Sequence, residues 1–136
     1  MKKNKRKKIG SSTNLFIIFL SSVPLIGLIF LEPIIANIIV QVFNMNINDV
    51  YNNTFIWLIF YASLNGFLGS YDNKQLNKSG INITNAMTWS AILVPVYLYK
   101  RGSVLSKTYK ISGLQSQWPL MTWVLFFFLS VLLMPV

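Results

Sequence analysis

Three long uncharged stretches divide this chain, and polar or basic segments separate them. Residues 15–31, 55–71 and 118–136 contain no Asp, Glu, Lys or Arg. A helix needs about 17–25 mostly apolar residues to cross the hydrocarbon core of a bilayer. The pattern therefore predicts an all-α, polytopic membrane protein with three full spans.

Two shorter apolar segments lie between these spans. Residues 34–43 follow Glu32 and Pro33, which should end the first span, and they are too short to cross, so we expect an interfacial helix. Residues 86–99 contain Pro95 and would reach only about 21 Å as a helix at about 1.5 Å per residue. This segment is either a short re-entrant or interfacial helix, or it is a fourth span.

The distribution of charge favours the re-entrant interpretation. The chain has 12 Lys and Arg residues against 3 Asp and Glu residues. Half of the basic residues lie in a tail, residues 1–13, which precedes a single membrane-embedded domain, residues 14–136; they are Lys2, Lys3, Lys5, Arg6, Lys7 and Lys8. If residues 86–99 do not cross, all basic residues face one compartment, as the positive-inside rule requires, and Glu32 and Asp49 face the other. The N-terminus is then cytoplasmic.

The basic tail also bears on partners. It has no interleaved aromatic residues, so we expect it to contact anionic lipid headgroups and not nucleic acid. A chain rich in Lys, Asn and Ile with this topology is typical of a bacterial cytoplasmic (inner) membrane.

Composition restricts the chemistry. The chain has no Cys and no His, which excludes disulfides, thiolate catalysis and metal sites built from these residues. Its three carboxylates are predicted on opposite faces of the membrane, so no paired-carboxylate site is expected. We therefore expect a protein that is not an enzyme and that binds no cofactor.

The second span offers a helix-packing surface. Ala62, Gly66 and Ser70 recur every four residues, which places three small side chains on one helical face. Such faces allow close approach of transmembrane helices. Ser63 and Asn65, polar residues in the same span, are expected to form interhelical hydrogen bonds.

The segment after this span carries a spaced motif. It reads Asp72-x3-Leu76-x3-Gly80, then Trp89-x5-Pro95-x-Tyr97-Leu98-x2-Arg101, with Trp118 opening the last apolar helix. The motif resembles a pattern in small bacterial membrane proteins of uncharacterised function. The resemblance covers residues 71–136 and implies a shared membrane-embedded module, without implying an activity.

A structural interpretation of the motif follows from its residue types. Residues 72–85 form a polar loop that turns at Gly80, and Pro95 bends the next segment so that Arg101 returns to pair with Asp72. We expect the rings of Trp89 and Tyr97 to lie at the two ends of that segment, Tyr97 at the headgroups with Tyr99.

Three functions fit these features. The first is an accessory or structural subunit that docks on another membrane protein or on a second copy of itself through helix contacts. The alternatives are an immunity or phage-exclusion protein of the membrane and a holin-like pore former.

The topology can be tested with reporter fusions. We expect fusions at residue 5, at Lys78 and at Lys107 to report the cytoplasm, and a fusion at Asn46 to report the exterior, because basic flanks stay inside. An external signal at Lys107 would instead require the fourth span.

Overall fold

The computed structural model describes residues 15–82 and 84–133, and this part of the chain is helical without any strand. The elements in order are α1 (Leu15–Ile26), the π-helical turn η2 (Gly27–Leu31), α2 (Glu32–Phe43), α3 (Ile47–Asn52), α4 (Thr54–Lys78), α5 (Asn85–Trp89), the 3₁₀ turn η3 (Ser90–Ile92), α6 (Val94–Tyr109) and α7 (Gly113–Leu133). The basic tail lies outside the described residues.

The first three elements form one continuous helix, Leu15–Phe43. The predicted break at Glu32 and Pro33, with a separate helix over residues 34–43, is therefore wrong. In η2 the N–H of Glu32 bonds to the carbonyl of Gly27, five residues back, so the hydrogen-bond ladder is already shifted where Pro33 arrives. Because the backbone hydrogen bonds are already displaced in this π-helical turn, the helix tolerates the ring of Pro33 and the absence of its backbone N–H.

Helix α4 is longer than predicted. It continues through Lys78, so Asp72 lies inside a helix and not in a loop. The predicted turn is present at Gly80, whose φ is 80°, and there the N–H of Ile81 bonds to the carbonyl of Leu76 at 3.1 Å. Both Ile81 and Leu76 are buried, which completes a Schellman termination.

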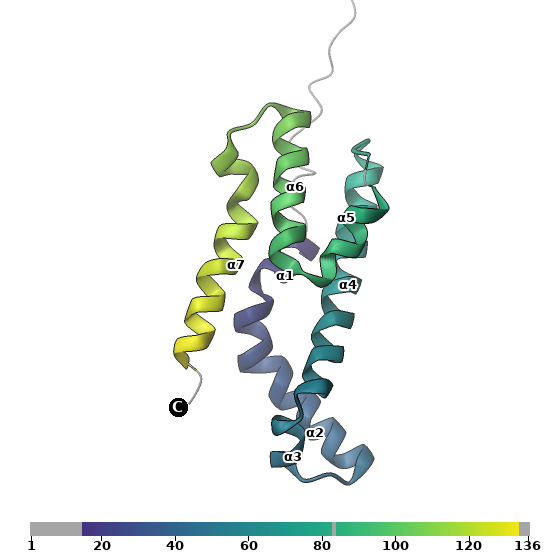
Figure 1. Cartoon of the computed structure of the whole chain (residues 1–136), viewed down its shortest axis with the longest axis vertical. Coiled ribbons are helices and arrows are strands. Elements are labelled where there is room, and N and C mark those ends of the chain that lie inside the picture. Colours follow the sequence, from purple (N-terminus) through teal and green to yellow (C-terminus); the bar gives the residue numbers. More distant parts are fainter. Residues whose placement is uncertain (1–14, 83, 134–136) are drawn as a thin grey trace, which may run out of the picture.

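The elements α5, η3 and α6 form a helical hairpin. Thr84 caps α5 by accepting a hydrogen bond from the N–H of Met87. The helix breaks at Leu93, whose ψ of 83° is not helical, and Pro95 occupies the first turn of α6. Figure 1 shows α5 descending from the end of α4 and α6 returning in the opposite direction. Helix α6 does not end at Lys100 and Arg101 as expected but at Tyr109.

The long helices pack around α1. Helix α1 lies against α4 and α7, α6 lies against α7, and η3 lies against α4 (Figure 1). Helix α7 begins at Gly113, earlier than the predicted start at Trp118, because Pro119 is accommodated within the helix. The last residues of the predicted third span, 134–136, lie outside the described part.

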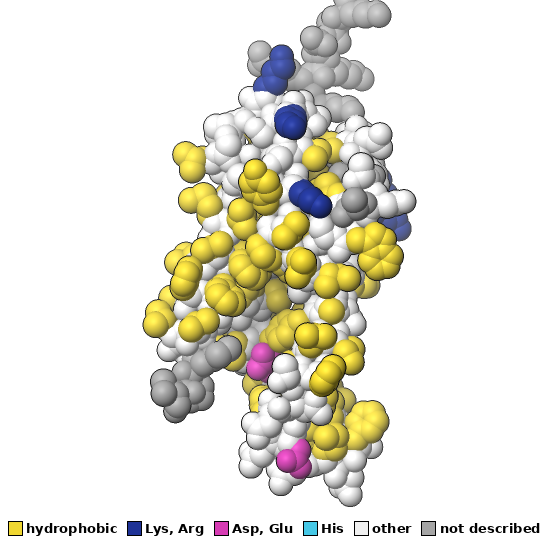
Figure 2. Space-filling model, viewed as in Figure 1, with side chains coloured by type: hydrophobic (Ala, Val, Ile, Leu, Met, Phe, Trp, Pro, Cys, Tyr) yellow, Lys and Arg dark blue, Asp and Glu magenta, His cyan; other side chains and the backbone are white. Residues whose placement is uncertain are grey.

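Within the described residues, two helices are long and apolar enough to cross a membrane, Leu15–Phe43 and Gly113–Leu133. Helix α4, whose C-terminal third is polar, does not reach that criterion. Apolar side chains cover much of the surface in Figure 2; the Lys and Arg side chains visible on this face lie on its upper half, and the visible acidic ones lie lower. A largely apolar exterior suits lipid as the solvent.

Two glycines of α4 provide a matched stability test. A Cβ at Gly69 would collide with Ala91 of η3, whereas a Cβ at Gly66 meets nothing within 4 Å. We expect Gly69→Ala to lower the free energy of unfolding by about 1–3 kcal/mol through overpacking. Gly66→Ala should be neutral or stabilising by up to about 1 kcal/mol, since Ala favours a helix. Unfolding in mild detergent measures both, and equal effects would contradict the Gly69–Ala91 contact.

Candidate functional site

The inner face of α4 positions the polar residues of the fold. Its buried residues recur at helical spacing; they are Asn65, Leu68, Gly69, Asp72, Asn73 and Leu76. Residues at this spacing share one helical face. The same face therefore carries the contact with η3 at Gly69 and the charge of Asp72.

Asp72 and Arg101 form a buried ion pair. The Nε of Arg101 donates to Oδ2 of Asp72 at 2.6 Å, and Nη2 donates to Oδ1 at 3.1 Å. The side chain of Asp72 is 0% exposed and that of Arg101 is 1% exposed. The predicted partners are thus in two-point contact, a geometry that gives the pair both strength and a fixed orientation.

Three further residues complete this cluster. The Tyr97 hydroxyl donates to Oδ2 of Asp72 at 2.5 Å and lies 2.8 Å from Oδ1 of Asn73. The Nδ2 of Asn73 in turn donates to the hydroxyl of Thr88 at 3.0 Å. We call Asp72, Asn73, Thr88, Tyr97 and Arg101 the polar cluster; it joins α4 to both arms of the hairpin.

The Tyr97 phenol stays a hydrogen-bond donor. Burial, followed by the charge of the Asp72 carboxylate, raises the pKa of Tyr97 above its ordinary value, and Arg101 opposes this shift. Tyr97 is 0% exposed, so its predicted place at the headgroups is wrong; the i, i+4 spacing to Arg101 puts both on the buried face of α6. That spacing is visible in the sequence and could have indicated the role of Tyr97.

The other motif residues take different positions. Trp89 is 74% exposed at the end of α5, and Tyr99 is 60% exposed on α6, so both rings are available to a lipid interface. Gly80 ends α4, and Pro95 follows the break of the hairpin. None of these four residues is part of the polar cluster.

The small-residue face is not used within the described chain. Ala62 and Gly66 are partly exposed, and Ser70 is exposed. The close approach of α4 to a neighbour occurs instead at Gly69, a residue that the four-residue spacing missed. The predicted helix contact at Ala62, Gly66 and Ser70 thus stays a prediction about a partner.

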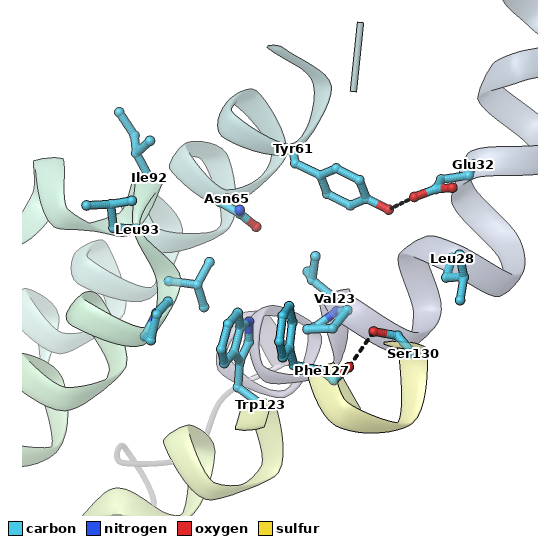
Figure 3. Close-up of a pocket in the computed structure, with 13 residues that line it drawn as sticks. Val23, Leu28, Glu32, Tyr61, Asn65, Ile92, Leu93, Trp123, Phe127 and Ser130 are labelled. Carbon is cyan, nitrogen blue, oxygen red and sulfur yellow. Dashed lines mark hydrogen bonds between the residues drawn. The ribbon is translucent and has the colours of Figure 1, made fainter. Parts of the chain in front are cut away.

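A second polar group lies at a pocket that the sequence did not indicate. The pocket has a volume of about 450 Å³ and is lined by α1, α2, α4, the hairpin turn and α7. The Tyr61 hydroxyl donates to Oε1 of Glu32 at 2.6 Å across one side of it. Figure 3 shows this pair, and the Asn65 amide pointing from α4 into the pocket. The expected interhelical hydrogen bond of Asn65 is absent at Oδ1, which is buried without a partner.

The chemistry of these groups is limited. Over residues 15–82 and 84–133 no three Asp, Glu, His or Cys side chains come together as metal ligands. Arg101 and Tyr97 both bind the carboxylate of Asp72, an arrangement that fixes the positions of these side chains. The pocket, which has an unpartnered buried acceptor in its lining, is the candidate binding site.

Comparison with known proteins finds no matching family, curated protein or solved structure. The resemblance of residues 71–136 to a bacterial membrane module accordingly stays a prediction.

The ion pair is testable by a double-mutant cycle. Asp72→Ala and Arg101→Ala should each lower the free energy of unfolding by about 3–5 kcal/mol, because each leaves an uncompensated buried charge. The double mutant should cost clearly less than the sum. Lys100→Ala, which removes an exposed neighbouring charge, should change little. Strictly additive losses in detergent unfolding would contradict a direct contact.

Proposed function

We propose that this chain is a small, non-enzymatic protein of a bacterial cytoplasmic membrane that acts as an accessory or structural subunit through helix contacts. The observation that carries the proposal is that its two buried charged residues pair with each other. Asp72 and Arg101 neutralise each other inside the fold, and the described chain keeps an apolar exterior. Such a molecule acts by presenting shaped helical surfaces to neighbours in lipid.

The proposed topology has three spans, α1–α2, the first part of α4, and α7, with α5–η3–α6 as a re-entrant hairpin. Its support is the reversal at Leu93, after which α6 runs back toward the end of the molecule where α4 ends (Figure 1). Helix α6 carries Lys100 and Lys107, and the last turns of α4 carry Lys74 and Lys78. Basic residues then gather at one face, for which the cytoplasmic side is favoured. The basic tail would contact anionic headgroups at that face.

The proposed docking surface is the face of Ala62, Gly66 and Ser70 on α4. Its support is the open space at Gly66, where a Cβ meets no atom within 4 Å. Neighbouring residues of α4 such as Phe67 (55% exposed) are apolar and accessible. A helix face of small residues beside exposed apolar side chains suits a partner helix, from another membrane protein or from a second copy.

Association measurements test this surface. Gly66→Leu should weaken binding to the partner helix about tenfold. The new side chain occupies the open space at Gly66, where the partner would approach, and its Cβ contacts no other residue of this chain. Energy transfer between two labelled copies measures self-association, and affinity purification in mild detergent measures capture of another membrane protein.

Val131→Leu is the matched control, since it adds bulk at an exposed position of α7. Association that survives Gly66→Leu in both measurements would show that the face is not a docking surface.

A further inference from the structure

The pocket between the helices has a mostly apolar wall. Its volume of about 450 Å³ lies within the range of about 300–1,000 Å³ that small-molecule sites occupy. On one side lie Trp123 and Phe127 of α7, with ring centroids 5.3 Å apart and planes nearly parallel. Val23 and Leu28 of the first helix and Ile92 and Leu93 of the hairpin turn supply further apolar surface (Figure 3).

Asn65 contributes a buried polar group to the pocket. Its side chain is only 8% exposed, and its Oδ1 has no hydrogen-bond partner. Tyr61 lies four residues before Asn65 on the same face of α4, and its ring extends away from Asn65 to the Glu32 carboxylate of α2 (Figure 3).

The pocket also has a charge without a counter-ion among its lining residues. Glu32 contributes a carboxylate, and none of the described residues that line the pocket is Lys or Arg. The hydrogen bond from Tyr61 supplies a neutral donor to one oxygen and no positive charge. In a low-dielectric surrounding, a cation within reach of this carboxylate would gain more than it would in water.

From these features we propose that the pocket binds a small apolar amine in its ammonium form. The ammonium group would pair with the Glu32 carboxylate, and the apolar body would pack on Trp123 and Phe127. Aromatic rings add a favourable interaction with cations. An anion would be repelled by Glu32, and a neutral molecule would leave that carboxylate without a counter-ion.

Three ligands with one rigid apolar body test the proposal. Adamantan-1-amine, adamantan-1-ol and adamantane-1-carboxylate differ only in the polar group, and calorimetric titration of the full chain in mild nonionic detergent compares them. We expect the amine to bind at least about tenfold more tightly than the alcohol, because charge-assisted hydrogen bonds exceed neutral ones, and the carboxylate not to bind. Equal affinity for the amine and the alcohol would overturn the proposal.

Variants locate the binding. Glu32→Gln keeps an acceptor for Tyr61 but removes the charge, so it should weaken amine binding about tenfold. Asp49→Asn is the control, since it removes an exposed carboxylate that does not line the pocket. Partition of the ligand into micelles is common to all variants, so their differences report the site. Amine affinity unchanged in Glu32→Gln, with the variant folded by circular dichroism, would overturn the proposal.

Discussion

The arrangement of the helices depends on one ion pair, whose two charged groups are buried away from water. Asp72 and Arg101 are both almost completely buried, and a buried ion that loses its partner costs several kcal/mol. Helix α6 therefore cannot slide or rotate along α4, because one residue of helix changes position by about 1.5 Å and about 100° and would separate the pair. Tyr97 and Asn73 add neutral hydrogen bonds that strengthen the same register.

This register brings the hairpin turn against α4, where Ala91 of η3 lies on Gly69. In the proposed re-entrant topology, the backbone polar groups of the turn must be satisfied within the protein. The turn meets this requirement locally: the N–H of Leu93 bonds to the carbonyl of Ser90, and the carbonyl of Leu93 accepts from Val96 and Tyr97. Pro95 needs no acceptor in the first turn of α6, and Gly69 leaves room for Ala91 beneath the polar cluster.

The pocket is a consequence of the same short hairpin. Because the chain reverses at Leu93 and does not continue alongside α4, α1 and α7, these helices diverge past the turn without a fourth helix between them. The residues of the turn, Ile92 to Pro95, accordingly line the pocket together with side chains of the long helices. The proposed docking face on α4 and the proposed amine site are distinct surfaces, so one could operate without the other.

The sequence by itself determined the helical class, the apolar segments, the turn at Gly80, the reversal near Pro95 and the pairing of Asp72 with Arg101. These follow from local periodicity, from turn chemistry and from the bend at Pro95, which returns Arg101 to the level of Asp72. Helix ends were predicted at Asp72, Arg101 and Trp118, but each of these residues lies inside a longer helix. Charged and aromatic residues can continue a helix when tertiary contacts bury them. Only the tertiary structure decided that Tyr97 is a core residue, that Gly69 is the close contact of α4, and that Glu32, Tyr61 and Asn65 share a pocket. Such assignments depend on which faces of distant helices meet, and no spacing within a single segment carries that information.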